Sequence, residues 1–351
     1  MTTIDVPASR NYQVIVGKGL LSQAGSRILP FCKGNTAAIV SDETVWGLYG
    51  GTLEASLKTT GLNVIHYTFP AGEASKNGEN YLKILNFLAE TKLTRRDVLV
   101  ALGGGVTGDL TGFVAATYLR GIAYVQIPTS LLSMVDSSVG GKTAIDLPAG
   151  KNLAGAFYQP SLVLCDMGAL STLPQEIFRD GCGEIIKYGV LYDKVLFDKL
   201  LAEGFSFDRE AVIARCVELK RNVVAEDEFD TGARQKLNLG HTIGHGIEAQ
   251  SHFTISHGEA VATGMAIVAR AGEKAGITSG DTVGAIHEIL EKFGFPLTTG
   301  YSAQQLFTSA LSDKKRSGGT VNLVVPREIG DCILLPTPLG QLQSFIEAGL
   351  A

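Results

Sequence analysis

Short apolar runs rich in β-branched residues recur along the first half of the chain and predict β-strands. Between these runs, apolar residues recur at helical spacing over residues 43–60, 76–92 and 107–118. Strands that alternate with helices predict a largely parallel sheet covered by helices, with ligands at the carboxyl ends of the strands. The expected strands span residues 12–16, 36–42, 63–69, 97–102, 122–127 and 162–166.

From about residue 175 the hydrophobic pattern becomes mostly helical, apart from two late apolar runs at 319–326 and 331–336 that we interpret as a pair of strands. We therefore predict an α/β, Rossmann-like domain with a mostly parallel sheet over residues 1–175. A mainly α-helical domain is expected over residues 176–351. Its expected helices span residues 176–190, 194–203, 208–226, 236–251, 256–275, 279–293 and 302–312.

The composition limits the classes of function. With 351 residues, 45% of them hydrophobic, the chain is long enough for two packed domains. A net charge of −5 gives no general attraction for nucleic acid, so an anionic ligand would need a local cluster of cations. We see no signal-peptide pattern and no apolar run of about 18 residues, and therefore expect no membrane partner. Five cysteines without a CxxC pair indicate reduced thiols and a cytoplasmic protein.

The stretch "LGGGVTGD" (102–109) follows a predicted strand and opens a predicted helix. Its glycines Gly103, Gly105 and Gly108 fit the G-x-G-x-x-G pattern, which lets the backbone approach a pyrophosphate at a helix N-terminus. The Rossmann version needs an acidic residue about 20 positions later, and residues 120–127 contain none. A dinucleotide loop and a purely structural turn therefore both remain open. Asp42 is a candidate for the ribose contact, with a helix N-cap as its alternative.

The stretch "DSSVGGKT" (136–143) is similar to a P-loop, but Asp136 stands where that motif needs glycine. The ATP-binding interpretation fails at this residue. Lys142 and Lys151 remain, which we expect on glycine-rich turns, with Asn152 next to the second lysine. This grouping favours a phosphate or carboxylate ligand, with solvated surface lysines as the alternative.

Four of the six histidines lie within residues 241–257. His241 and His245 are four residues apart on a predicted helix and so share one face, but "HTIGH" lacks the glutamate of HExxH. His257 begins the next predicted helix, and Glu184 in "RDGCGEIIKYG" is the strongest candidate for a third ligand. Two imidazoles, one carboxylate and an open position suit a catalytic Zn²⁺. A buried core histidine remains the alternative for His245, and His252 is expected on the surface.

Residues 101–160 form the longest of five stretches that match a known family. The others are "TLPQEIFRDGCGEIIKYG" (172–189), "RQKLNLGHTIGHGIEA" (234–249), "SHGEAVATGM" (256–265) and "DKK" (313–315). Together they resemble the 3-dehydroquinate synthase family over nearly the whole chain. The resemblance implies bound NAD, one divalent metal (usually Zn²⁺, with Co²⁺ as an alternative) and a homodimer.

The implied reaction converts 3-deoxy-D-arabino-heptulosonate 7-phosphate into 3-dehydroquinate and phosphate, a step of the shikimate route to aromatic amino acids. It comprises transient NAD-dependent oxidation, phosphate elimination, reduction, ring opening and aldol closure. The substrate carries a phosphate and a carboxylate, and each needs a cationic clamp.

The resemblance also implies roles for individual residues. The implied metal ligands are Glu184, His241 and His257. The implied NAD contacts are Asp42, Glu73, Lys76, Gly104, Gly105, Val106, Thr107, Gly108, Asp109, Thr129, Ser130, Lys142, Lys151 and Thr172. The implied catalytic and substrate contacts are Asp136, Lys142, Lys151, Asn152, Lys187, Lys220, Arg234, Asn238, His245 and one of Lys314 and Lys315, with Arg120 from the partner subunit. The chain departs from the family at Ser130, often threonine, and at Asp230, usually glutamate.

Three alternatives remain. Another sugar-phosphate cyclase would share the glycine loop and the metal ligands but alter the substrate contacts. A metal-dependent polyol dehydrogenase would share the two-domain plan but needs no cationic clamp, so the number of candidate lysines argues against it. A catalytically inactive metal or nucleotide binder would lack some of these side chains.

Overall fold

The computed structural model describes residues 1–314 and 319–351. The chain separates into two compact units. The first contains residues 1–174 and 209–229, and the second contains residues 175–208 and 230–351. Our expected second domain began at residue 176, close to this division, but the segment 209–229 groups with the first unit.

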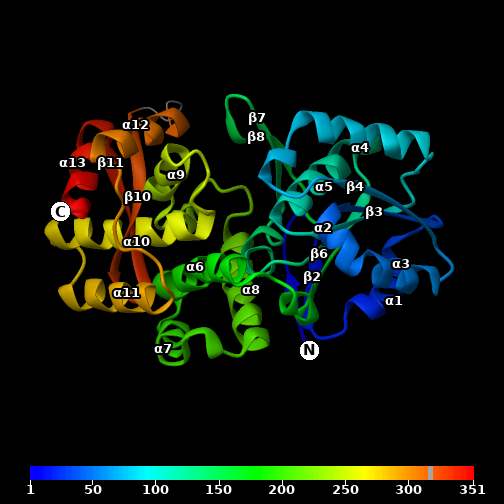
Figure 1. The fold of residues 1–351 in the computed structure, drawn as a ribbon, viewed down its shortest axis with the longest axis horizontal. Coiled ribbons are helices and arrows are strands. Elements are labelled where there is room, and N and C mark those ends of the chain that lie inside the picture. The colour runs from blue at the N-terminus through cyan, green and yellow to red at the C-terminus, as the bar shows by residue number, and fades with distance from the viewer. Residues whose placement is uncertain (315–318) are drawn as a thin grey trace. The chain divides into compact units, whose positions relative to one another are not determined.

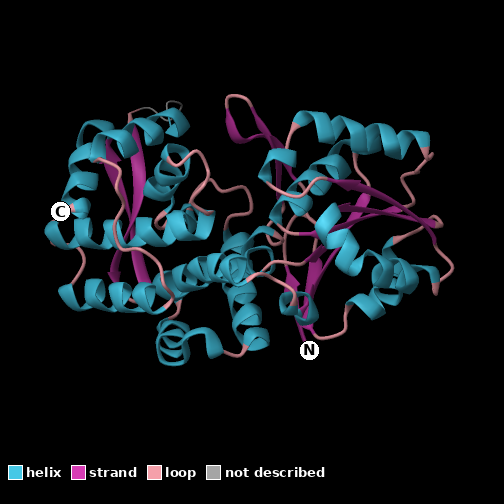
Figure 2. Cartoon of the chain, in the orientation of Figure 1, coloured by secondary structure: helices cyan, strands magenta, loops and turns pink. Residues whose placement is uncertain are grey.

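The first unit is built on a seven-stranded sheet with the order β1-β2-β9-β6-β5-β3-β4 (Figure 2). All neighbouring strands are parallel except β1 and β2. The edge strand β1 was not predicted, whereas the other six lie where the apolar runs indicated. The strands are β1 (Thr2–Val6), β2 (Tyr12–Gly17), β3 (Thr36–Asp42), β4 (Asn63–Phe69), β5 (Val98–Gly103), β6 (Ala123–Pro128) and β9 (Leu162–Asp166).

Helices cover both faces of this sheet, which explains why its central strands are apolar throughout (Figure 1). Ile39 of β3 packs with α1 (Ala24–Ile28) and α3 (Gly51–Lys58) on one face. Its neighbours Ala38 and Val40 pack with α4 (Gly78–Glu90) and α5 (Gly105–Thr117) on the other. Successive strand residues point to opposite faces, so both faces are buried. The short helix α2 (Glu43–Val45) follows β3.

Residues 142–157 form an antiparallel hairpin, β7 (Lys142–Leu147) and β8 (Gly150–Phe157). Our prediction that Lys142 and Lys151 lie on tight turns was therefore wrong, because both belong to the hairpin strands. Gly155 explains how so small a hairpin packs: a Cβ at this position would lie 2.1 Å from the Thr143 carbonyl oxygen. Ile145 anchors the hairpin in the core of the first unit.

Helix α8 (Arg209–Glu226) was predicted as a helix but placed in the wrong domain. Its Lys220 ammonium donates to the Asp136 backbone carbonyl over 2.5 Å. Just beyond α8, Glu228 accepts hydrogen bonds from the Ser9 amide and from Gln159 at 2.7 and 2.8 Å. These partners are distant in sequence, so the helical pattern alone could not reveal them.

The second unit surrounds the buried helix α10 (His257–Lys274) with other helices and a hairpin. The hairpin joins β10 (Thr320–Glu328) to β11 (Asp331–Pro338), as the late apolar runs predicted. Helix α13 was not predicted. The remaining helices are α6 (Gln175–Tyr192), α7 (Lys194–Glu203), α9 (His241–Gln250), α11 (Gly280–Lys292), α12 (Ala303–Lys314) and α13 (Leu339–Leu350).

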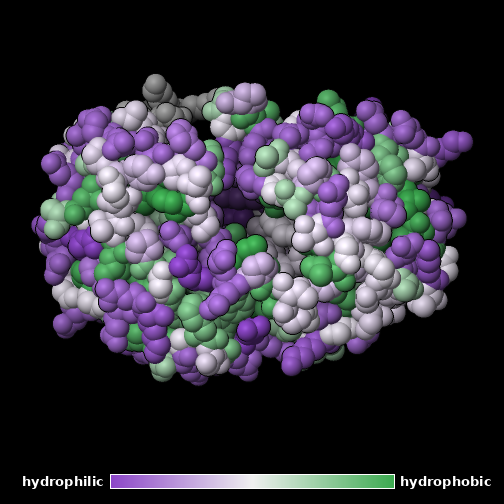
Figure 3. All heavy atoms as spheres, in the orientation of Figure 1, coloured by the Kyte–Doolittle hydropathy of each residue, from purple (hydrophilic) through white to green (hydrophobic). Residues whose placement is uncertain are grey.

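Hydrophobic side chains occur as scattered groups among hydrophilic ones on the visible face of both units (Figure 3). All five cysteines are buried thiols outside any disulfide, as the sequence indicated, and burial raises the pKa of Cys332 to about 12. Within residues 1–314 and 319–351, no helix combines the length and apolar character needed to cross a membrane.

Candidate metal centre and active site

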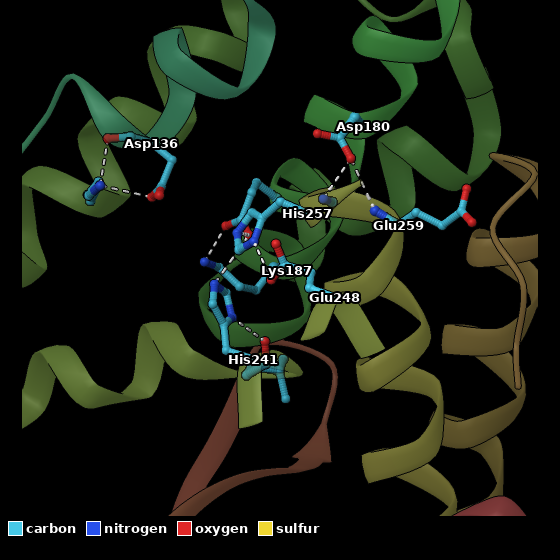
Figure 4. A network of polar contacts seen from close by, with 11 residues as sticks. Asp136, Asp180, Lys187, His241, Glu248, His257 and Glu259 are labelled. Carbon is cyan, nitrogen blue, oxygen red and sulfur yellow. Dashed lines mark hydrogen bonds and ion pairs between the residues drawn. The ribbon is translucent and has the colours of Figure 1, made fainter. Parts of the chain in front are cut away.

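Three side chains of the second unit converge on one point: Glu184 of α6, His241 at the start of α9 and His257 at the start of α10. The Nε2 atoms of His241 and His257 lie 3.5 and 3.6 Å from the Glu184 Oε1 atom. One ligand atom from each residue lies within 4.8 Å of the others. Figure 4 shows the two imidazole rings converging beside Lys187.

Close helix packing creates this convergence. A Cβ on Gly258 would lie 1.9 Å from the Asp180 backbone oxygen, so only glycine lets α10 begin this close to α6. The Asp180 carboxylate accepts hydrogen bonds from the backbone N–H groups of Gly258 and Glu259 at 2.6 and 3.2 Å (Figure 4). This carboxylate satisfies the N-terminal amides of α10 and fixes the backbone next to His257.

The Glu184 end of the site is deeply buried, whereas the His257 side chain is 31% exposed. The side chains of Glu184 and Lys187 are 0% and 1% exposed, and they form an ion pair one helical turn apart. Burial, followed by the charge of Lys187, lowers the pKa of His241 well below its ordinary value. Burial also acts to lower the pKa of His257, but hydrogen bonds and charges from Glu184 and Glu248 outweigh it and raise this pKa to about 10.

The donor set fits a divalent transition metal. The lowered pKa of His241 favours the neutral imidazole that a metal ligand must be, and Glu184 supplies a carboxylate oxygen. The carboxylates that raise the pKa of His257 equally favour a metal cation at its Nε2 atom. With two nitrogens and one oxygen, a metal would keep coordination positions open for a substrate.

The second nitrogen of each candidate ligand is also occupied. The Nδ1 atom of His241 lies 3.0 Å from the Leu239 carbonyl oxygen, and that of His257 lies 3.2 Å from a Glu248 carboxylate oxygen. Sequence reasoning missed both Glu248 and Asp180. One signal for Glu248 was available: it follows His241 by seven residues, which places it two helical turns away on the same face.

His245 lies beside this cluster. Its ring centroid is 5.5 Å from that of His241 and 6.1 Å from that of His257. The residue is exposed, so the alternative of a buried core histidine is wrong. His245, Glu248 and His257 form a second group with ligand-type atoms within 4.8 Å of one another. His252 is exposed, as expected.

In the first unit, residues expected to contact NAD and residues expected to contact substrate form one polar network. The Lys76 ammonium lies 2.5 Å from an Asp109 carboxylate oxygen and 2.6 Å from the Asn152 amide oxygen. Burial acts to lower the pKa of Lys76, but the charges of Asp109 and Glu73 raise it. Lys151 in turn lies 3.7 Å from Glu73.

The glycine loop has the geometry of a strand-to-helix turn. β5 ends at Gly103, Gly104 is the N-cap, and α5 begins at Gly105. The amide of Thr129 donates to the Gly103 carbonyl over 3.0 Å, which holds the ends of β5 and β6 together. The first turn of α5 therefore carries the remaining glycine-loop candidates Val106, Thr107 and Gly108, of which Thr107 is buried.

Other candidates of the first unit are distributed around its sheet. Asp42 is the N-cap of α2 and accepts from the Val45 amide over 2.9 Å, in agreement with the capping alternative. Thr172 is exposed and hydrogen-bonds Tyr49. Lys220 forms an ion pair with Asp136 over 2.9 Å. Arg120 is exposed and has a left-handed backbone with φ of 66°.

In the second unit, Arg234 and Asn238 lie on a 3-10 helix, residues 233–238, that leads into His241. Arg234 is buried and Asn238 is exposed. Lys314 ends α12, and Lys315 lies outside the described residues.

Comparison with known families decides the relationship. Residues 66–180 match the family model for the 3-dehydroquinate synthase N-terminal region, and residues 181–316 match the model for the C-terminal region. A 3-dehydroquinate synthase from Clostridium acetobutylicum is 42% identical over 343 residues, covering 95% of this chain and 96% of that protein. The chain belongs to the 3-dehydroquinate synthase family.

Solved structures agree with this assignment at the level of the fold. A 2-deoxy-scyllo-inosose synthase complexed with carbaglucose-6-phosphate, NAD⁺ and Co²⁺ has a TM-score of 0.89 and 25% identity, covering 99% of this chain and 100% of that one. A 2-epi-5-epi-valiolone synthase from Streptomyces hygroscopicus, with NAD⁺ and Zn²⁺ bound, has a TM-score of 0.88 and 27% identity, covering 97% and 95%. The predicted fold, an α/β domain with a mostly parallel sheet followed by a mainly helical domain, is confirmed, and the chain shares it with these two cyclases.

Membership in the 3-dehydroquinate synthase family also separates the alternatives. The Clostridium synthase is 42% identical to this chain, compared with 25% and 27% for the inosose and valiolone synthases. A different cyclase specificity is therefore disfavoured, and so is a polyol dehydrogenase.

Proposed function

We propose that this family member converts 3-deoxy-D-arabino-heptulosonate 7-phosphate into 3-dehydroquinate and phosphate. It is an enzyme of the phosphate-eliminating lyase type, and its cofactors are NAD and one divalent metal. Close relatives named 3-dehydroquinate synthase support the reaction. The single structural observation that carries the proposal is the buried convergence of Glu184, His241 and His257 beside Lys187.

We further propose that these three side chains bind the metal and that the metal is Zn²⁺, because two imidazoles and one carboxylate suit its open catalytic sites. When bound, NAD supplies reversible hydride acceptance and the metal supplies Lewis acidity. Lys187 is 1% exposed and contacts the Glu184 carboxylate, so it can hold or move a proton in a water-poor environment.

The substrate's phosphate and carboxylate would be bound by the cations of the proposed substrate set. Each charge-assisted hydrogen bond of this kind contributes about 1.5–3 kcal/mol. Lys220 supports this proposal because it is already desolvated, at 6% side-chain exposure, and its position is fixed by Asp136. The proposed set comprises Asp136, Lys142, Lys151, Asn152, Lys187, Lys220, Arg234, Asn238, His245 and one of Lys314 and Lys315, with Arg120 of the partner subunit.

The proposed NAD contacts remain Asp42, Glu73, Lys76, residues 104–109, Thr129, Ser130, Lys142, Lys151 and Thr172. Three features support this set: the N-terminus of α5 with its glycine loop, the clustering of Lys76 with Asp109, and the position of Asp42 at the carboxyl end of β3. We propose residues 1–175 as the NAD-binding domain and residues 176–351 as the domain for metal and substrate; helix α8, which carries Lys220, belongs to the first compact unit.

We also propose a cytoplasmic homodimer. The exposed Arg120, in its left-handed backbone conformation, is the residue we expect to reach into the partner's site. Sedimentation analysis should give twice the chain mass of 37.1 kDa. An R120A variant that stays dimeric should lose substrate affinity. A monomer with full activity would overturn both the homodimer and the role of Arg120 in the partner's site.

The test of function is incubation of the purified chain with the heptulosonate phosphate, NAD⁺ and Zn²⁺. We expect equimolar phosphate and 3-dehydroquinate without net accumulation of NADH, because the cofactor is regenerated in each cycle. Net NADH formation from a polyol without phosphate release would instead identify a dehydrogenase. Replacing His245 by alanine should lower kcat/KM, and unchanged kcat/KM would exclude its role in phosphate contact or proton transfer.

A further inference from the structure

Glu248 carries a buried carboxylate with no role in the proposed reaction. It belongs to α9 and is 4% exposed. One carboxylate oxygen lies 3.2 Å from the Nδ1 atom of His257, whose Nε2 atom faces Glu184 (Figure 4). We propose that Glu248 is a positioning residue, which accepts the Nδ1–H of His257 and thereby keeps the Nε2 lone pair directed at the metal. This inference rests on the proposed metal ligands.

The physical reason is the two-sided chemistry of imidazole. A neutral histidine has one N–H donor and one acceptor nitrogen, and only the acceptor can bind a metal. A carboxylate at Nδ1 selects the tautomer with its lone pair on Nε2, stops the ring from rotating and makes Nε2 more basic. His241 is held more weakly, because its Nδ1 atom contacts the neutral carbonyl of Leu239.

The backbone of Glu248 is also fixed. Its carbonyl oxygen accepts hydrogen bonds from the Phe253 amide at 2.8 Å and from the Ser251 hydroxyl at 2.9 Å. These bonds close the loop that connects α9 to α10. Within the helix pair, a Cβ on Gly264 would lie 2.1 Å from the Gly240 carbonyl oxygen, so α9 and α10 are in close contact. Glu248 and His257 are therefore presented to each other by a rigid frame.

A competing role exists for the same carboxylate. His245, Glu248 and His257 also form a group whose ligand atoms lie within 4.8 Å of one another. In that arrangement Glu248 would bind the metal directly and would not orient a ligand. Replacing Glu248 by glutamine separates the two roles. Glutamine keeps an oxygen that can accept the hydrogen bond from His257, but it is a poor metal ligand.

The experiment measures Zn²⁺ affinity by chelator competition on metal-free protein, for wild type, E248Q, E248M and the control E259Q. Glu259 is a suitable control because it is two residues from His257 but pairs with Arg179. We expect wild type and E259Q to bind one ion with equal affinity. E248M should bind about 10–100-fold more weakly, and E248Q should recover most of this loss.

A second measurement needs no variant of Glu248. In the zinc-loaded wild-type protein labelled with ¹⁵N-histidine, NMR should show a proton on Nδ1 of His257 and the metal-shifted resonance on Nε2. A third measurement uses the variant: cobalt-substituted E248Q should retain the wild-type visible absorption spectrum, because the coordinating atoms are unchanged.

Three results would overturn the inference: E248M with the affinity of E259Q, E248Q as weak as E248M, or metal on Nδ1 of His257. If E248M does not fold, the NMR result and the zinc affinity of E248Q still test whether Glu248 orients His257. A wild-type protein that binds no ion would instead refute the proposed metal ligands, so the two failures can be told apart.

Discussion

Two buried charge clusters in this chain are compensated in different ways. In the first unit, Lys76 and Asp109 form an ion pair at 2.5 Å, and Asn152 accepts a further bond from the same ammonium. In the second unit, the carboxylates of Glu184 and Glu248 face His241, His257 and one ammonium, that of Lys187. Among these side chains, Lys76 and Asp109 balance each other, whereas the two carboxylates of the second group outnumber its one ammonium when both histidines are neutral.

This difference shows that the Glu184 cluster, unlike the Lys76 cluster, needs an additional positive charge. A buried carboxylate is costly unless a positive charge or several hydrogen bonds compensate it. The Lys76 cluster meets that need from within the chain. In the Glu184 cluster the need is met either by a proton on His257, whose pKa Glu184 and Glu248 raise to about 10, or by a divalent metal.

The largest expected effect follows from Glu184→Ala. Removing the carboxylate that both histidines face should abolish tight Zn²⁺ binding and lower kcat/KM by about 10²–10³-fold or more. Metal content and phosphate release measure the two effects, and circular dichroism checks folding. A variant that still holds one zinc per chain and turns over would contradict this account, because Glu184 would then not be the carboxylate that requires the ion.

Breaking the self-neutralising cluster should affect stability instead. K76M leaves the Asp109 carboxylate without its ammonium and should cost about 3–5 kcal/mol in urea unfolding. The double variant K76M/D109L removes both charges and should cost clearly less. The raised pKa of Lys76 means that its stabilisation is complete below about pH 10.4 and is lost as the pH rises through the higher folded value. Equal losses in the two variants would contradict the ion-pair account.

Gly258→Ala tests whether helix packing holds the second cluster together. A methyl group 1.9 Å from the Asp180 oxygen must push α10 away from α6, and with it His257 away from Glu184. We expect a loss of about 1–3 kcal/mol in stability together with weaker zinc binding. Gly284→Ala is the matched control, since a Cβ there meets nothing within 4 Å in helix α11. Zinc affinity unchanged by G258A would show that the packing is not what aligns the ligands.

The smallest effect concerns a third kind of buried carboxylate, one compensated by N–H and O–H donors alone. Asp97 accepts from the amides of Asn35, Thr36 and Thr94. Burial acts to raise the pKa of Asp97, but hydrogen bonds from Thr94, Thr36 and Asn35 lower it overall. Its stabilisation is therefore present above about pH 3.9 and is lost as the pH falls through the lower folded value.

Replacing Asp97 by asparagine should cost about 1–2 kcal/mol at pH 7. One accepting oxygen becomes an NH2 group that cannot accept, and the bonds to the other oxygen lose their charge assistance. Urea unfolding at pH 7 and pH 3 measures this loss, which should shrink in acid. The exposed E90Q should leave the profile unchanged. A loss that is the same at both pH values would mean that charge is not the cause.

Much of the fold could be read from local pattern. The strands of the parallel sheet were predicted because they are buried on both faces and therefore consist of continuous apolar residues. The hairpin of β7 and β8 was missed, because its pairing depends on Gly155 meeting Thr143 and not on a hydrophobic run. The grouping of α8 with the first unit was missed because it depends on contacts such as Lys220 with Asp136.

For the candidate site, the residue types, the helical spacing of the histidines and the family could all be predicted from the sequence. The orientation of the rings could not be predicted, because it depends on side chains brought together from different helices. The folded structure was needed to show that His245 is exposed, that Glu248 contacts His257, and that Asp180 fixes the start of α10. Periodicity fixes which face of a helix a residue occupies, whereas packing of one helix on another fixes what that face meets.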